Sequence, residues 1–253
     1  MALTKVGKEG VVGLDNSADA TAITIDSSER VMIGTTTEGE ASADDLTVAG
    51  SANTGITIRA GTSNSSSIYM SDATSGTGEY AGYIAYSHSA NSMSFGTNAG
   101  SSMTIDSTGA VTKPKQPAFL VQPSTPQSNF GADGNNDTIA FGTERFDQGS
   151  DFASNTFTAP VTGKYQLSAN IYLTNIDSAA DYYQLTLYTS NRSYYYAFDV
   201  SSADSDPNRF TFQVNVLADM DASDQAFVMI LQVNGTAQTD IAVESYFSGC
   251  LVC

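Results

Sequence analysis

One stretch of strict alternation restricts the fold of this chain more than any other feature of its sequence. Between Gly163 and Thr174, every second residue is apolar or aromatic on one side of the pattern: Tyr165, Leu167, Ala169, Ile171 and Leu173. Successive side chains of a β-strand point to opposite faces. The stretch therefore predicts a strand with one face in a core and the other toward water or a partner.

The composition favours short strands and many turns along the whole chain. Gly, Ser, Thr, Asn and Asp are abundant, and no long 3.6-residue pattern with helix caps occurs. The 253 residues, 41% of them apolar, suffice for one sizeable core or two small ones. We therefore expect an all-β chain.

The charge excludes two classes of partner. The net charge is -17, from 10 basic and 27 acidic residues. Binding to nucleic acid or to an anionic membrane surface needs a basic face, so we expect neither. No run of 18 apolar residues occurs, which argues against membrane insertion, and the first eight residues lack the apolar region of a secretory signal.

The second half of the chain reads as a two-sheet sandwich of the jelly-roll kind. Turn residues separate about eight to ten candidate strands, and no helical pattern interrupts them. The predicted strands are Ala118–Val121, Thr138–Phe141, Phe157–Ala159, Gly163–Thr174, Tyr182–Thr189, Tyr194–Val200, Arg209–Leu217, Gln225–Val233 and Ile241–Val252.

The first half repeats one small device. Residues 23–31 and 103–111 align position for position, each as a strand, a tight turn and a strand, with Asp26 and Asp106 opening the turns. Further short strands are predicted at Leu46–Val48, Gly55–Arg59, Ser67–Met70, Tyr83–Tyr86 and Ser92–Phe95.

Such strands offer only two or three apolar side chains each, too few for a stable isolated hairpin. We predict that they bury their apolar faces against other copies of the chain, as in a homotrimer. A monomeric glycine-rich β-domain or a partly disordered linker is the alternative. The two prolines of Lys113–Pro117 mark a hinge, so the predicted regions are 1–112, 113–117 and 118–253.

Few residues could carry chemistry. The single histidine, His88, lies in a serine-rich loop with no carboxylate placed to orient it, so we expect a turn or interface residue. Residues 133–137 with Glu144 imitate a calcium loop but lack its sixth-position glycine. We expect no cofactor, with calcium a weak alternative. Cys250 and Cys253 would face opposite sides of a strand, which favours buried or terminal thiols over a zinc or redox site.

The tyrosines form the most suggestive surface. Five of them fall on two neighbouring predicted strands, with rings on both faces. Inward rings would belong to the core or a trimer contact, and outward rings could stack on sugars. The candidate receptor or interface residues are Tyr182, Tyr183, Tyr194, Tyr195 and Tyr196.

Two stretches of the first half resemble bacteriophage tail-fibre and related virion-appendage proteins. The strand pair of residues 82–98 with the hairpin of residues 103–111 is similar to theirs, as is the opening of residues 13–25. The resemblance covers about residues 10–112. It implies an N-terminal attachment region and a β-rich shaft.

The second half resembles another family. Residues 157–165, Phe-Thr-Ala-Pro-Val-Thr-Gly-Lys-Tyr, and residues 244–252 resemble the two ends of the globular head of complement component one-q and its tumour-necrosis-factor-like relatives. The resemblance implies a jelly roll that trimerises around a three-fold axis. No collagen-like Gly-X-Y repeat precedes the head, which fits a phage fibre better than an animal secreted protein.

Together these resemblances imply a non-enzymatic virion fibre whose head binds a host-surface glycan or outer-membrane component multivalently. The N-terminal region would contact other virion proteins. One alternative is a structural, decoration or cement protein of the capsid or tail. A second alternative is a depolymerase tailspike, for which no paired-carboxylate motif is found.

Overall fold

The computed structural model describes residues 23–131, 134–201 and 203–253. The chain divides into two units between Ser66 and Ser67. The described residues form β-strands and one short 3-10 helix, η1 (Gly76–Tyr80), which confirms the all-β prediction. Within this part of the chain, no helix is long and apolar enough to span a membrane.

The first unit contains a small three-stranded sheet. Its strands are β1 (Ile23–Ile25), β2 (Val31–Ile33) and β3 (Leu46–Val48). The pair β1–β2 is antiparallel as predicted, and β3 adds to β2 in parallel. Arg30 ties the two connections together, because its guanidinium contacts Asp26 and Asp44 at 2.5 Å each. The predicted strand at Gly55–Arg59 is wrong, since these residues pair with no strand.

A five-stranded sheet follows, in the order β4-β5-β6-β7-β8, and its pairs from β5 to β8 are antiparallel. Its strands are β4 (Ser65–Met70), β5 (Gly82–Ser87), β6 (Ser92–Thr97), β7 (Gly100–Ile105) and β8 (Val111–Thr112). The second copy of the repeated hairpin joins β7 to β8, as its sequence predicts. Almost every side chain of this sheet stays partly exposed, so the sheet has little core of its own.

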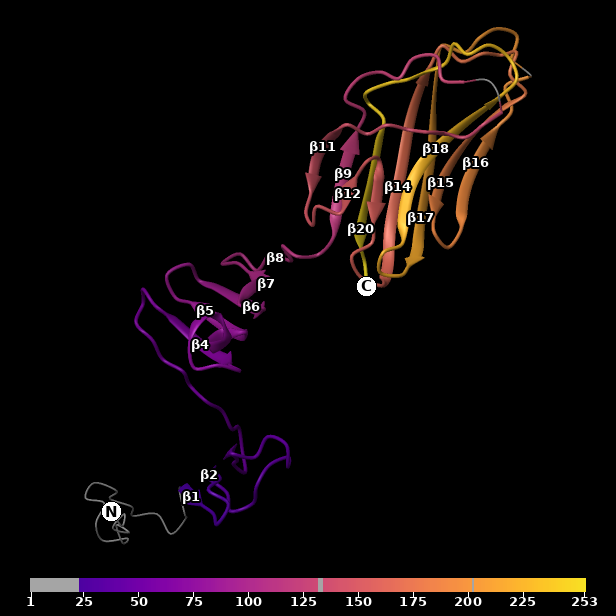
Figure 1. Cartoon of the computed structure of the whole chain (residues 1–253). Helices are drawn as coiled ribbons and strands as arrows, with labels where there is room; N and C mark the ends of the chain where they lie inside the picture. Colours follow the sequence, from indigo (N-terminus) through magenta and orange to yellow (C-terminus); the bar gives the residue numbers. More distant parts are fainter. Residues whose placement is uncertain (1–22, 132–133, 202) are drawn as a thin grey trace, which may run out of the picture. The chain divides into compact units, whose positions relative to one another are not determined.

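The last 136 residues form the head, a sandwich of two antiparallel sheets (Figure 1). One sheet, which we call the inner sheet, contains β11 (Thr143–Asp147), β9 (Ala118–Gln122), β20 (Tyr246–Leu251), β14 (Gly163–Thr174) and β17 (Arg209–Met220), with β19 (Asp240–Ile241) beside β14. The outer sheet contains β12 (Phe152–Ala153), β13 (Thr156–Thr158), β18 (Gln225–Val233), β15 (Tyr182–Thr189) and β16 (Ser193–Phe198), with β10 (Asp137–Thr138) beside β18. This is the predicted jelly roll.

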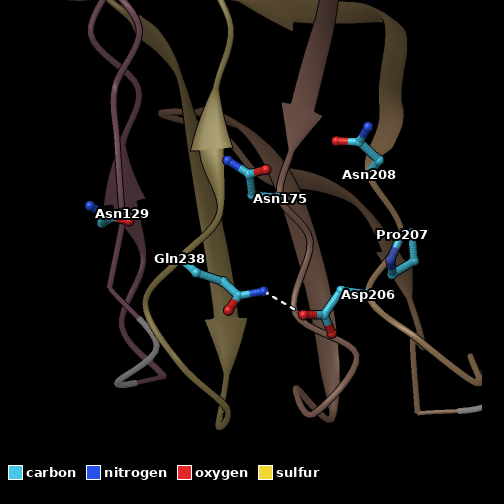
Figure 2. Close-up of a pocket in the computed structure, with 6 residues that line it drawn as sticks. All are labelled: Asn129, Asn175, Asp206, Pro207, Asn208 and Gln238. Carbon is cyan, nitrogen blue, oxygen red and sulfur yellow. Dashed lines mark hydrogen bonds between the residues drawn. The ribbon is translucent and has the colours of Figure 1, made fainter.

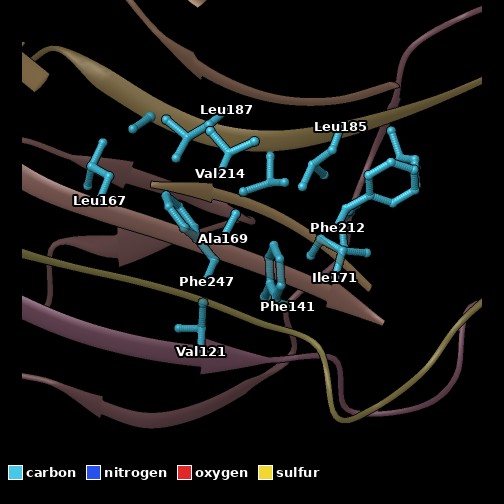
Figure 3. Close-up of a cluster of buried hydrophobic side chains, with 14 of the residues drawn as sticks. Val121, Phe141, Leu167, Ala169, Ile171, Leu185, Leu187, Phe212, Val214 and Phe247 are labelled. Atoms are coloured by element: carbon cyan, nitrogen blue, oxygen red, sulfur yellow. The ribbon is translucent and has the colours of Figure 1, made fainter. Parts of the chain in front are cut away.

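The core of the head lies between these sheets (Figure 3). All five alternating residues of β14 are fully buried there, which confirms the predicted periodicity. Gly249 of β20 faces the same core. A Cβ at this position would lie 2.7 Å from the ring of Phe119 and 2.6 Å from Leu167, so the close packing of the two neighbours requires glycine.

Two predicted strands of the head are interrupted or irregular in the structure, and four others differ from it by one to three residues at one or both ends. The stretch Ile241–Val252 is interrupted, because Ser245 turns the chain and its hydroxyl accepts a hydrogen bond from the amide of Tyr172. Most of Thr138–Phe141 is irregular, and the amide of Phe141 donates to the side chain of Asn155 instead of a neighbouring strand. The short strands β11 and β12 were not predicted, since neither shows an alternating pattern.

The proline-containing segment is attached to the head by hydrogen bonds. The side chain of Gln148 donates to the carbonyls of Lys113 and Gln116, both at 2.8 Å. Gln116 in turn donates to the carbonyl of Leu251 at 2.6 Å. All but the first two residues of the five-stranded sheet fall within the same unit as the head, so the predicted boundary at residues 113–117 stays a prediction.

Candidate functional site

Four loops of the head converge on one open pocket of about 480 Å³. Each loop leaves a strand at the same end of the sandwich: the β9–β10, β14–β15, β16–β17 and β18–β19 connections. Figure 2 shows the side chains that they contribute: Asn129, Asn175, Asp206, Pro207, Asn208 and Gln238. The lining is thus dominated by amides.

This pocket lies at the end of the head away from the preceding chain. The end of β20 pairs with the start of β14 and with the start of β9, so the chain enters and leaves the sandwich at one end. Asn175 directly follows β14 and lies at the other end. In Figure 1 the C-terminus accordingly lies away from the loops that follow β14 and β16.

Both carboxylates near the pocket are already hydrogen-bonded by the protein. Asp206 accepts from the amide and hydroxyl of Ser178 and from Gln238, which lowers the pKa of Asp206 to about 2. Asp240 accepts from the backbone amide of Asn129 and from the side chain of Asn175, both at 2.9 Å. The carboxylates therefore brace the loops against one another.

Several neutral groups of the pocket remain available. Among the described residues, the side-chain amides of Asn129 and Asn208 make no hydrogen bond to protein, and the side-chain oxygens of Asn175 and Gln238 accept none. Asn129 and Asn175 both adopt a φ of 55°, a left-handed conformation that asparagine tolerates better than most residues. Braced loops with free amides are suited to hydrogen-bonding a ligand.

The structure separates the five candidate tyrosines. Tyr183 is a correction, because its ring is fully buried and its hydroxyl accepts from the amide of Asp177 at 3.0 Å and contacts Thr239 at 2.8 Å. It is a core residue and offers no surface to a partner. Burial raises the pKa of Tyr183, although these two hydrogen bonds partly oppose the rise. Tyr182 is half-buried.

The three tyrosines of β16 occupy an edge strand. Tyr194 is half-buried against the core, and Tyr196 lies on the same side with its ring 5.8 Å from that of Phe212. Tyr195 points to the opposite face and is 68% exposed. The tyrosines therefore form no single surface, and their role in binding stays a prediction.

The other candidates lie apart from the pocket. The ring of His88 packs edge-on against Tyr86 at 5.1 Å. Cys250 and Cys253 are both exposed free thiols, so of the two expected alternatives the structure contradicts burial and agrees with terminal thiols. Of the calcium-like stretch, Asp133 lies outside the described residues, whereas Glu144 lies on β11. Within residues that the structure describes, no group of three or more His, Cys, Asp or Glu side chains could hold a metal.

A comparison with protein-family models identifies the family of the head. The model described as the C1q domain matches residues 118–252, which is more than half of the chain. The chain belongs to the C1q family. C1q and tumour-necrosis-factor-like domains are typically non-enzymatic binding modules that form homotrimers.

Solved structures similar to this C1q head include two animal proteins. The globular domain of zebrafish complement 1qA is 15% identical, with 55% of this chain and 98% of that chain covered and a TM-score of 0.40. Murine APRIL, crystallised at pH 8.0, is 11% identical, with 55% and 100% covered and a TM-score of 0.40. No curated protein matches the chain.

Proposed function

We propose that this C1q-family chain is a non-enzymatic fibre protein of a bacteriophage virion. Three copies would form a β-rich shaft from residues 1–112, and their heads, residues 118–253, would bind a polysaccharide receptor on the host surface. The N-terminal region would attach the fibre to other virion proteins. No cofactor is required for this role.

The observation that carries the proposal is the exposed apolar surface of the short-stranded half. Ile25, Ile56 and Tyr69 are between 60% and 69% exposed in the single chain. Isolated short sheets with so little core are marginal in water. Burial against two further copies would remove these side chains from water, and the family's trimeric heads favour that number of copies.

Binding by a trimer gains strength without chemistry. A fibre would carry three heads, and a particle several fibres. Once one head has bound, the binding of the others becomes intramolecular, which raises the overall affinity. Even a weak single site would then hold a particle on a cell.

Adsorption and light scattering test this function. Light scattering of the purified chain is expected to give the mass of a trimer; a monomer would overturn the shaft argument. The soluble protein is expected to adsorb to host cells and to block infection. Adsorption to stripped capsids or tails instead would favour the decoration or cement role. Release of oligosaccharides from host polysaccharide would identify a depolymerase.

A further inference from the structure

We propose that the loop pocket of the head binds a neutral, hydroxyl-rich sugar unit of the host polysaccharide. This inference rests on the proposed receptor-binding function and assigns it to a different surface from the tyrosines. The pocket contains Asn129, Asn175, Asn208 and Gln238 around Asp206. Its position at the end of the sandwich opposite the chain entry leaves it free to meet a cell surface.

The free groups of the pocket match the chemistry of a sugar. A side-chain amide offers both donors and an acceptor, and a sugar hydroxyl likewise donates and accepts. The amides of Asn129 and Asn208 are free of protein partners among the described residues, and Asn175 and Gln238 each keep a side-chain oxygen available. Four amides from four loops thus offer donors and acceptors to the hydroxyls of a sugar in this pocket.

The charges disfavour an anionic ligand. Asp206 keeps its negative charge above a pKa of about 2, and Asp240 is bonded to two lining residues. The head as a whole carries 15 acidic and 4 basic residues from Ala118 onward, a net charge of -11. An acidic sugar or a phosphate would meet this field without a cationic partner in the pocket.

A divalent cation and an apolar ligand also fit poorly. Calcium takes six to eight oxygen ligands, often charged, whereas the oxygens of Asp206 and Asp240 already accept protein hydrogen bonds. Pockets for apolar ligands are lined by hydrophobic and aromatic side chains, and this lining contains only Pro207 of an apolar kind. The volume of about 480 Å³ lies within the range of about 300–1,000 Å³ for small-ligand sites.

Hydrogen bonds to Asp240 and Asp206 hold the loops, and two of the four side-chain amides, in place before a ligand binds. Asp240 bonds Asn129 of one loop and Asn175 of another, while Asp206 bonds Ser178 and Gln238. The side chains of Asn175 and Gln238 are thus fixed and lose little freedom on binding, which favours affinity. Since the ionisation of Asp206 is complete above its low pKa, this carboxylate gives no reason for sugar binding to change between pH 5 and pH 8.

The substitution Asn208→Asp tests the site with little effect on the fold. It keeps the shape of a side chain that bonds no described protein group, removes the donor and adds a negative charge to the pocket. The matched control is Gln225→Glu, which likewise keeps the side-chain shape and adds the same charge at the exposed first residue of β18, at the opposite end of the sandwich. The full-length protein and both variants are applied to an array of immobilised neutral and acidic bacterial surface polysaccharides.

We expect the wild-type protein to bind neutral polysaccharides, Asn208→Asp to weaken this binding at least tenfold, and Gln225→Glu to leave it unchanged. If Asn208→Asp binds as tightly as the wild type, or if only Tyr195→Ser loses binding, the proposal that the pocket binds the sugar is overturned. The proposed receptor binding would remain. If the wild-type protein adsorbs to host cells but binds no neutral glycan, the pocket proposal is overturned and receptor binding again remains. Absence of adsorption to host cells by the wild-type protein contradicts the receptor-binding function itself.

Discussion

Glu29 and Gly109 occupy the same position in two copies of one hairpin turn, and both have a positive φ, of 66° and 87°. In each copy the aspartate that opens the turn accepts hydrogen bonds from amides two and four residues later, from Ser28 and Arg30 in the first copy. Asp106 bonds Thr108 and Ala110 in the same way. The turn therefore requires a left-handed backbone conformation at this position, which Gly109 adopts easily and Glu29 adopts with a Cβ.

Replacing Glu29 with glycine should stabilise the first hairpin. A left-handed conformation costs a residue with a Cβ about 1–2 kcal/mol, and the exposed side chain of Glu29 makes no hydrogen bond or ion pair with the described residues that would offset this. Hydrogen exchange of residues 23–33 should therefore slow in Glu29→Gly by roughly fivefold or more. The reciprocal variant Gly109→Ala should speed exchange of β7 and β8. Unchanged exchange in both variants would contradict the strain.

Asp151 should make the head less stable at neutral than at acidic pH. One of its carboxyl oxygens is enclosed and has no hydrogen-bond partner among the described residues. Burial, aided by repulsion from Asp147, raises the pKa of Asp151. Because the folded state then binds the proton more tightly, the stabilising contribution is complete below the unfolded pKa and is lost as the pH rises through the folded pKa.

The variant Asp151→Asn should accordingly melt at a higher temperature than the wild type at pH 7, and the difference should shrink at pH 3. The control Asp204→Asn removes the same formal charge from an exposed loop residue. An equal gain from both variants would show that general charge repulsion, and not the enclosed carboxylate, is responsible.

Tyr183→Phe should lower the stability of the head and leave sugar binding unchanged. The variant removes the hydroxyl that accepts from the buried amide of Asp177, and a buried donor left without a partner costs about 1–3 kcal/mol. Thermal unfolding of the full chain measures the loss, with the array described above as the binding assay. Loss of binding by a folded Tyr183→Phe variant would be inconsistent with its place in the core.

The sandwich could be predicted from the sequence because its long central strands alternate strictly. The predicted bounds of Gly163–Thr174, Tyr182–Thr189 and Gln225–Val233 agree with the structure residue by residue. The break before β20 could not be predicted, since the apolar residues Ile241 and Val243 continue the pattern through a turn. That turn is held by hydrogen bonds to the distant Tyr172, from the amide of Ala242 and to the hydroxyl of Ser245.

The candidate site was harder to predict. The tyrosines stood out because they are clustered in sequence, yet the fold buries Tyr183 and turns Tyr195 away from Tyr196. The pocket combines single amides from loops far apart in the chain, such as Asn129 and Gln238. The only local signal was the turn chemistry at each loop, of which Asp206-Pro207 is an example, and turn residues alone do not indicate convergence.

The exposed side chain of Leu217 offers a test of the trimer. This residue lies on the outward face of β17 in the inner sheet, 56% exposed and opposite Gln166 of β14. In a monomer, a glutamate there would be harmless. In a trimer that covers this face, the charge would be buried without a partner, at a cost of about 3–5 kcal/mol.

Leu217→Glu should therefore dissociate the trimer, as measured by light scattering over a range of concentrations. Val243→Glu is the matched control, because it introduces the same charge at an exposed apolar residue in the turn between β19 and β20. A Leu217→Glu protein with the trimer mass at every concentration would mean that this face of the inner sheet stays in water. The heads would then have to associate through another surface, such as the aromatic edge where Tyr196 meets Phe212.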